Sequence, residues 1–202
     1  MISSYTWENS INTMEALNIG AVDFITKPRE DAKTGLWKLK HEIITKIRTA
    51  ACTHIRPYAM VGKNRKFVPA ASMTNSNKII AVGASTGGTS AIERLLRFMP
   101  PNINGTVIVQ HMPARYTKAY AKRLDSLLPM DIKEADNLDR LDRGKVLVAP
   151  GGMHINIAKD HTGYYVRLLN GPPIKYQQPS INMFFNSVAN TCLLYTSDAA
   201  DE

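Results

Sequence analysis

The sequence predicts an α/β fold in which a parallel sheet is covered by helices. From residue 78 onward, short apolar runs alternate with segments whose apolar residues recur at helical spacing. Runs such as "VIV" at 107–109 are continuous, which is typical of strands buried on both faces. Of the 202 residues, 44% are hydrophobic, which is enough for a packed core.

Residues 1–51 predict a helix at 9–19, a short strand at 21–28 and a second helix at 35–50. Gly20 is a plausible C-cap of the first helix, and Pro28 ends the strand. The apolar positions of the two helices are Ile11, Met14 and Leu17, and Leu36, Leu39, Ile43 and Ile47. About fifty residues bury little core. We therefore expect this segment to be the end of a larger domain.

Residues 52–77 mix basic, polar and Pro residues without a period, which predicts a linker. At the other end, residues 192–202 read "CLLYTSDAADE" and continue no hydrophobic period. Over their whole length they are similar to the conceptual translation of a transposase-type sequencing adapter. We therefore expect a non-native tail, and a natural chain cut at about Thr191.

Residues 78–191 carry the alternation on which the fold class depends. The expected strands are 78–84, 105–110 and 145–152, and a hairpin is expected to join 154–158 to 164–169. The expected helices follow the first two strands and end at prolines. Their apolar positions are Ile92, Leu95, Leu96 and Met99, and Tyr120, Leu124, Leu127 and Leu128. In such sheets, functional residues gather beyond the carboxyl ends of the strands.

Charge and composition exclude several classes of protein. The formal net charge is +8, but the basic residues are scattered, and no aromatic and basic pattern marks a nucleic-acid motif. No run of 18 apolar residues could span a membrane, and the start lacks the pattern of a signal peptide. Two cysteines, Cys52 and Cys192, make no framework of disulfides or metal ligands. We expect a cytoplasmic protein.

Ser85 and His111 are the candidate catalytic residues. Each follows a predicted strand, and they are one strand–helix–strand unit apart, so both side chains could meet at the same edge of the sheet. Histidine can take the proton of a serine hydroxyl and activate it as a nucleophile. Gly87 and Gly88 allow a sharp turn and the close approach of a substrate. Backbone N–H groups from Thr86 onward open a helix, where they could stabilise an oxyanion.

A loop that binds a small ligand is the alternative for the same segment. The run "GASTGG" lacks the Lys of a Walker loop and matches neither G-x-G-x-x-G nor G-x-S-x-G. The local sequence therefore leaves a nucleophile and an anion-binding loop equally open, with a structural turn close behind. Taken alone, His111 is better explained as a hydrogen-bonded polar residue at the end of a strand.

Four blocks together carry a resemblance to a known family. They are "KIIAVGASTGGTSAIERLL", "VIVQHMPARYTKAYAKRLD", "KVLVAPGGMHINI" and "QPSINMFFNSVA". In order and separation they resemble the catalytic domain of the chemotaxis protein-glutamate methylesterase family, over about residues 78–190. "MISSYT" and "LNIGAVDFITKP" are similar to the last third of a phosphoacceptor receiver domain. The resemblance implies a truncated Rossmann-like esterase domain, preceded by the end of a flavodoxin-like receiver.

The resemblance implies roles for particular residues. Ser85 matches the nucleophile, His111 the general base and the Thr86 backbone N–H one oxyanion donor. The third triad member is implied to be an aspartate in a Gly-rich loop after the "PSINMFF" helix, and we expect this chain to end before that loop. We therefore expect the chain to be inactive or badly folded. No aspartate of the esterase segment sits at a matching position, and we nominate none of Asp131, Asp136, Asp139, Asp142 and Asp160.

In the receiver part, Ser3 resembles the switch hydroxyl residue, Phe24 the switch aromatic and Lys27 the lysine that contacts the phosphoryl group. The phosphoacceptor aspartate and the acidic pair that holds Mg²⁺ would precede Met1. From the local sequence alone, Phe24 is better explained as a strand residue packed on its neighbours.

One pair of residues departs from the family pattern, and one further histidine needs an interpretation. Gln178 and Asn182 stand where the family commonly has Arg and Asp, a change that alters either substrate docking or a helix cap. His154 lies in a loop that resembles one near the family's active cleft. A structural role for His154, bonding a neighbouring carbonyl, is favoured over catalysis.

The implied function is hydrolysis of glutamate methyl esters on the cytoplasmic helices of chemoreceptors, with deamidation of receptor glutamine as a related reaction. The esterase step is expected to need no metal or organic cofactor, while an intact receiver would need Mg²⁺. The implied partners are methyl-accepting chemoreceptors and a histidine kinase that phosphorylates the receiver. The rival hypotheses are a non-catalytic module that binds receptor segments and a nucleotide-binding α/β domain.

Overall fold

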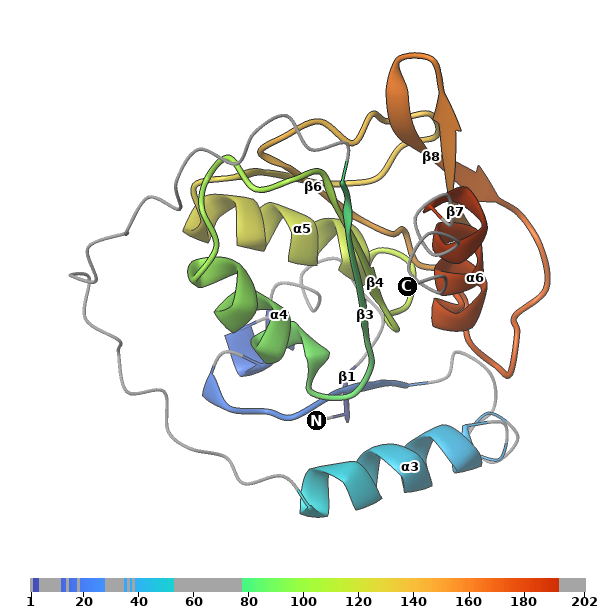
Figure 1. Ribbon diagram of the computed structural model, residues 1–202. Helices are drawn as coiled ribbons and strands as arrows, with labels where there is room; N and C mark the ends of the chain where they lie inside the picture. Colours follow the sequence, from blue (N-terminus) through green and yellow to red (C-terminus); the bar gives the residue numbers. More distant parts are fainter. Residues whose placement is uncertain are drawn as a thin grey trace, which may run out of the picture. The chain divides into compact units, whose positions relative to one another are not determined.

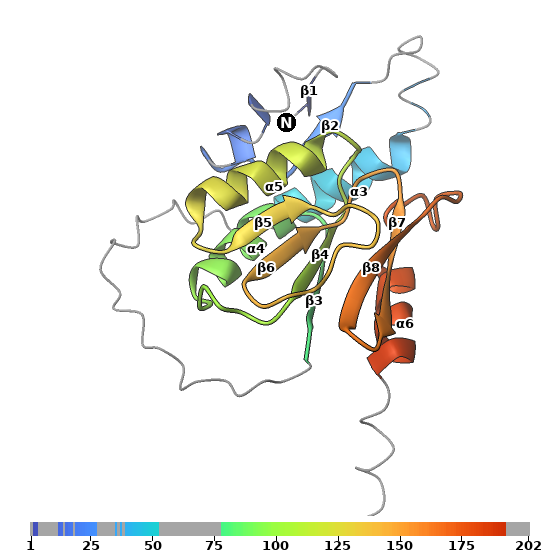
Figure 2. The same ribbon diagram turned by 90° about the horizontal axis from the view of Figure 1, so that it is seen from above.

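Four parallel strands form the main sheet of the computed structural model, in the order β3-β4-β6-β5 (Figures 1 and 2). They are β3 (Ile80–Ala84), β4 (Thr106–Gln110), β5 (Asp131–Glu134) and β6 (Lys145–Val148). All four pair in parallel, and every residue of β4 is buried. The predicted fold class, a parallel sheet with helices, is confirmed for this part of the chain.

The structure describes residues 2–3, 12–13, 15–17, 19–27, 35, 37, 39–52 and 78–192. The chain divides into two compact units, Met1–Val68 with Thr86–Arg94, and Pro69–Ser85 with Leu95–Glu202. The expected linker beyond Cys52 and the expected tail beyond Cys192 lie outside the described residues. The same holds for four positions named above, Ile11, Met14, Pro28 and Leu36.

Two helices of the second unit cover opposite faces of the sheet (Figures 1 and 2). Helix α5 (Tyr116–Leu127) contacts β5 and β6, and helix α6 (Ile181–Cys192) contacts β3 and β4. Helix α4 (Gly88–Arg97) follows β3 in the chain. None of the helices in the described part of the chain is long and apolar enough to cross a membrane.

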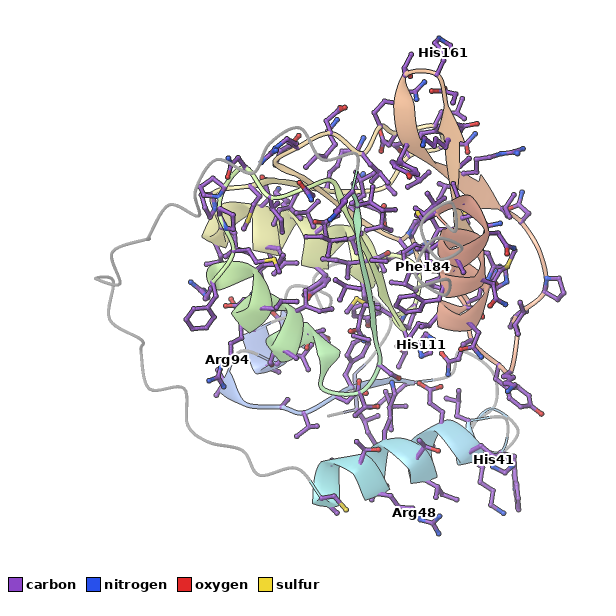
Figure 3. The ribbon with its side chains drawn as sticks, in the orientation of Figure 1. His41, Arg48, Arg94, His111, His161 and Phe184 are labelled. Atoms are coloured by element: carbon purple, nitrogen blue, oxygen red, sulfur yellow. The ribbon has the colours of Figure 1, made fainter. Side chains whose placement is uncertain are left out.

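Each face of the sheet has its own core. Successive side chains of a strand point to opposite faces, so Val107 and Val109 share one face while Ile108 lies on the other. Val107 and Val109 belong to the cluster that contains Phe184 of α6 (Figure 3). The largest fully buried residues of α5 are Tyr116, Tyr120 and Leu124.

The predicted hairpin is confirmed as β7 (His154–Asp160) and β8 (Gly163–Leu169), paired antiparallel with His161 in the turn (Figure 3). Arg140 binds Asp160 in β7 through two parallel hydrogen bonds of 2.8 and 2.7 Å. Its guanidinium also lies 5.1 Å from the centre of the Tyr165 ring in β8. One arginine therefore holds both strands near the hairpin turn.

The first unit contains a two-residue parallel pair, β1 (Ile2–Ser3) with β2 (Ile25–Thr26). Residues 12–13, 15–17 and 19 between them are helical, and the buried Leu17 is part of the predicted apolar face. The strand predicted at 21–28 is much shorter than expected. Side chains bind the backbone just before β2, since Asp23 Oδ1 accepts from the Phe24 N–H and Lys46 Nζ donates to the Phe24 carbonyl oxygen.

Helix α3 (Lys40–Ala51) confirms the second predicted helix but not the burial of its apolar face. No residue of α3 is buried, and Ile47 is 60% exposed. Helical spacing therefore predicted the conformation here, while burial depends on what packs against the helix.

Strand β5 was not expected from the sequence. Of its four residues only Ile132 is buried, because the strand lies at the edge of the sheet. A short, mostly polar edge strand shows neither the continuous apolar run nor the clear alternation that predicts a strand. Strand β6 is also shorter than the predicted 145–152, because the residues after Val148 form a loop.

We expect Phe184→Ala to lower the free energy of unfolding by about 3–5 kcal/mol, because it empties a fully buried ring site in the core. Phe185→Ala is the matched control, since the neighbouring ring is 42% exposed. Urea denaturation of both variants tests this. A loss in Phe184→Ala below this range and no larger than that in Phe185→Ala would contradict the role of Phe184 in the core.

The pKa of Asp160 is lowered, because Arg140 and then Thr162 donate hydrogen bonds to its ionised carboxylate. This group therefore stabilises the fold above its unfolded pKa, and the contribution is lost as pH falls toward its folded value. We expect Asp160→Asn to flatten the fall of melting temperature between about pH 5 and pH 2. A fall as steep as in the unsubstituted protein would contradict this role.

Candidate active site

The register of β3 and β4 brings the two predicted side chains together. Ala84 lies opposite Gln110, and the next N–H along the chain, that of His111, donates to the Ala84 carbonyl oxygen at 3.0 Å. Ser85 follows Ala84 directly. Both side chains therefore start from the carboxyl edge of the sheet, as the sequence predicts.

Ser85 Oγ lies 3.1 Å from His111 Nδ1, within hydrogen-bonding distance. Ser85 is exposed and His111 is half-buried. His111 follows the last residue of β4 (Figure 3). When Nδ1 is unprotonated it accepts the Ser85 O–H, and the neutral ring then carries its proton on Nε2. In that tautomer Nδ1 can take the hydroxyl proton while Oγ bonds to an electrophile.

The segment after Ser85 turns sharply. Thr86 and Gly87 form a turn, and helix α4 begins at Gly88. Gly87 has a φ of +76°, a left-handed conformation that glycine adopts without the penalty of a side chain. The predicted sharp turn at Gly87 is confirmed. The close approach of a substrate and the oxyanion role of the Thr86 N–H stay predictions.

Gln110 was missed by the sequence analysis. Its side chain is almost fully buried, and its Nε2 lies 2.9 Å from the Ser85 carbonyl oxygen and 3.3 Å from that of His111. The only available signal was a polar residue at the end of an otherwise apolar strand. That signal is weak, because many strands end in a polar residue.

The loop after β6 supports the loop that follows His111. A Cβ added to Gly151 would lie 2.4 Å from the Ala114 N and 2.5 Å from the Met112 carbonyl oxygen, so only glycine fits. The Gly151 N–H donates to Thr117 Oγ1 at 3.1 Å, and that hydroxyl donates to Glu134 Oε1 at 2.5 Å. Two loops are thereby packed backbone to backbone beside the candidate site.

His154 connects three backbone segments. The imidazole is buried, its Nδ1 accepts the Ser180 N–H at 3.1 Å, and its Nε2 lies 3.0 Å from the Pro172 carbonyl oxygen. Because Nδ1 accepts a backbone proton, the ring proton sits on Nε2 and is donated to Pro172. Both ring nitrogens are engaged by backbone groups, which supports the structural role over catalysis.

Helix α6 begins close to the strand that leads to Ser85. A Cβ on Gly83 would lie 2.7 Å from side-chain atoms of both Ile181 and Phe185, so the helix packs directly on this glycine. Ser180 Oγ accepts the Met183 N–H at 3.3 Å and caps the helix. The cap is therefore not Asn182, which is exposed.

Gln178 stands where the family commonly has Arg. Its Nε2 donates to the Gly171 carbonyl oxygen at 2.9 Å, which ties together the two ends of the loop between β8 and α6. In this chain the side chain at position 178 is thus engaged with the protein's own backbone.

Most of the aspartates that were not nominated are paired with cations. Asp136 and Asp139 bind Lys133, Asp142 binds Lys145, and Asp160 binds Arg140. Asp131 is exposed in the edge strand β5. That none of these five residues belongs to the candidate site stays a prediction.

The three receiver candidates lie in the first unit. Ser3 is in β1 opposite Thr26 in β2, and Lys27 is exposed directly after β2. Phe24 is buried, and Lys46 Nζ lies 5.4 Å from the centre of its ring. This burial agrees with the packing explanation for Phe24, and the switch roles of all three residues stay predictions.

A cavity of about 490 Å³ lies between β7 and α6, lined mainly by asparagine and hydroxyl side chains. Neither Ser85 nor His111 lines it. Within the described ranges, no group of three His, Cys, Asp or Glu side chains is arranged to hold a metal ion.

We expect Gly151→Ala to lower the melting temperature and to displace His111, because the added Cβ collides with backbone atoms that cannot move aside. Gly171→Ala is the control, since its Cβ would meet its nearest atom at an ordinary 3.6 Å. Thermal unfolding and the ring ¹⁵N shifts of His111 measure the two effects. A Gly151→Ala protein that matches the control in both would contradict this packing argument.

Comparison with known proteins agrees with the fold. The CheB methylesterase family matches residues 80–194 of the chain. The crystal structure of the Thermotoga maritima CheB methylesterase catalytic domain is 31% identical, with a TM-score of 0.54. That match covers 57% of this chain and 61% of the Thermotoga chain.

Curated relatives extend the similarity along the chain. A protein-glutamate methylesterase/protein-glutamine glutaminase from Thiobacillus denitrificans is 40% identical over 196 residues, which cover 95% of this chain and 55% of the relative. A protein with the same activities in its name, from Geobacter metallireducens, is 39% identical over 199 residues, covering 94% and 55%. The chain thus spans about half the length of these relatives. Its sequence and its sheet place the chain in the CheB methylesterase family.

Proposed function

We propose that Ser85 and His111 are the nucleophile and the general base of a protein-glutamate methylesterase. The 3.1 Å distance between Ser85 Oγ and His111 Nδ1 carries the proposal, because it puts a base within reach of an exposed hydroxyl. The names of the relatives support glutamate methyl esters as the substrate, and glutamine side chains as a second one. The esters are those of chemoreceptors, and the reaction takes place in the cytoplasm.

The reaction is acyl transfer in two steps. His111 Nδ1 takes the proton of Ser85 as Oγ bonds to the ester carbonyl carbon, and methanol leaves with that proton. Water then attacks the acyl-serine with His111 as the base, which releases the glutamate carboxylate and restores the hydroxyl. With a glutamine side chain the same attack releases ammonia in place of methanol.

Two further parts of the mechanism rest on the family resemblance. The Thr86 backbone N–H is the proposed donor to the oxyanion of the tetrahedral intermediate. An aspartate is expected to orient the imidazole, and it is assigned to no residue of this sequence. The esterase step is proposed to use no metal or organic cofactor.

We also propose that residues 1–51 are part of a receiver domain. The parallel pairing of β1 with β2 on either side of a helical segment supports this, as does the coverage of 94% or more of the chain by relatives. Ser3, Phe24 and Lys27 are the proposed switch residues, and a histidine kinase is the proposed phosphoryl donor. Mg²⁺ would bind acidic residues of an intact receiver that are assigned to no position in this sequence.

A fluorophosphonate probe tests Ser85 directly. Covalent labelling needs a single attack by the serine and does not need the ester turnover that this chain is expected to lack. We expect one adduct on the Ser85 peptide by mass spectrometry, none in Ser85→Ala, and labelling at least about 100-fold slower in His111→Ala. A peptide that contains a glutamate methyl ester should protect Ser85 better than the same peptide with free glutamate.

Ser90→Ala is the matched control, since Ser90 is exposed in helix α4 and outside the candidate site. Labelling that persists in Ser85→Ala would refute the nucleophile. Peptide binding without any labelling of Ser85 would favour the non-catalytic module, and thermal stabilisation by nucleotide would favour the nucleotide-binding domain.

A further inference from the structure

The side chain of Gln110 contacts the backbone of both candidate catalytic residues. Its Nε2 lies 2.9 Å from the carbonyl oxygen of Ser85 and 3.3 Å from that of His111. The primary amide carries two protons on one nitrogen, so it can donate to both carbonyl groups at once. A single side chain thus connects the backbones of both residues.

The two acceptors fix the orientation of the amide. A flipped amide would place Oε1 against two carbonyl oxygens, which is repulsive, so the nitrogen faces Ser85 and His111. No other common side chain does the same at this length. Asparagine is one methylene shorter, glutamate has no donor when ionised, and methionine has none at all.

The amide is held at a cost to stability. Gln110 is 4% exposed, and its Oε1 is buried without a hydrogen-bond partner among the described residues. A buried carbonyl oxygen without a donor destabilises a fold. An apolar residue would avoid this cost at the end of a strand that is otherwise apolar. The polar residue therefore suggests a role beyond packing.

The strand ladder ends at the two candidate residues. Its last bond joins the His111 N–H to the Ala84 carbonyl oxygen, while β3 and β4 themselves end at Ala84 and Gln110. Beyond that bond, Gln110 supplies the two hydrogen bonds that continue the connection. Both bonds are made to the carbonyl groups of Ser85 and His111, whose side chains lie 3.1 Å apart.

We propose that Gln110 is a positioning residue that holds Ser85 and His111 in reactive register through their carbonyl groups. The proposal rests on the proposed function for its catalytic meaning. Displacing reacting groups by about 1 Å can cost about 100-fold in rate, so loss of both bonds is expected to slow the attack of Ser85 by about 10- to 100-fold.

The test compares Gln110→Met, which keeps the length and loses both donors, with Gln110→Asn, which keeps the amide but is too short to reach both carbonyls. Thr106→Val is the matched control, because it removes one buried side-chain hydrogen bond from the opposite end of β4. Fluorophosphonate labelling of Ser85, the melting temperature and the ring ¹⁵N shifts of His111 are measured for the full 202-residue chain.

We expect both Gln110 variants to slow labelling by about 10-fold or more and to shift the His111 Nδ1 signal toward that of Ser85→Ala. Thr106→Val should lower the melting temperature while leaving labelling within about 2-fold. Labelling and a His111 Nδ1 signal like those of the unsubstituted protein in Gln110→Met would overturn the proposal. The proposal would also be overturned if Thr106→Val lost as much labelling as the Gln110 variants when its melting temperature falls by the same amount as theirs.

The ¹⁵N measurement separates this proposal from the proposed function. If the unsubstituted protein is not labelled at Ser85, the esterase function fails. The His111 signal still shows whether Gln110 holds the Ser85–His111 contact. If Gln110→Met does not fold, the same two readouts on Gln110→Asn decide the proposal.

Discussion

The parallel register between β3 and β4 is the constraint on which the rest of the site depends. Because Ala84 lies opposite Gln110, the two strands end at the same level, and the next residues of each chain segment are Ser85 and His111. A shift of this register by one residue would turn every side chain of β4 to the other face of the sheet. The fully buried Val107, Ile108 and Val109 would then exchange their surroundings, so core packing enforces the register.

Beyond the last hydrogen bonds between the strands, side-chain hydrogen bonds and close backbone contacts hold the loops at the carboxyl edge of the sheet. Gln110 connects the backbones of Ser85 and His111, and Gly151 lets the loop after β6 lie directly on the loop after His111. His154 fixes the residue that caps α6, and α6 in turn packs on Gly83 beside Ser85. The candidate site is therefore supported by buried hydrogen bonds and close backbone contacts on several sides, which is how a fold holds exposed reactive groups in place.

The core and the edges of the sheet differed in how well the sequence predicted them. Apolar runs and helical spacing gave β3, β4, the hairpin and helices α4 and α5, because each of these elements carries an apolar run or an apolar face in its sequence. Strand β5 was missed because an edge strand needs only one buried residue, Ile132. On α3 the predicted apolar face is not buried, since periodicity describes a helix and not what packs on it.

The sequence by itself determined most of the elements but not the edge strand β5, their order along the chain, and two candidate residues that each follow a strand. It determined these because they depend on local composition, spacing and turn residues. Only the tertiary structure decided that Ser85 and His111 touch, that His154 is occupied by the backbone and that Gln110 bridges the pair. Those facts depend on contacts between residues far apart in the chain, whose geometry is set by strand register and core packing rather than by any local pattern.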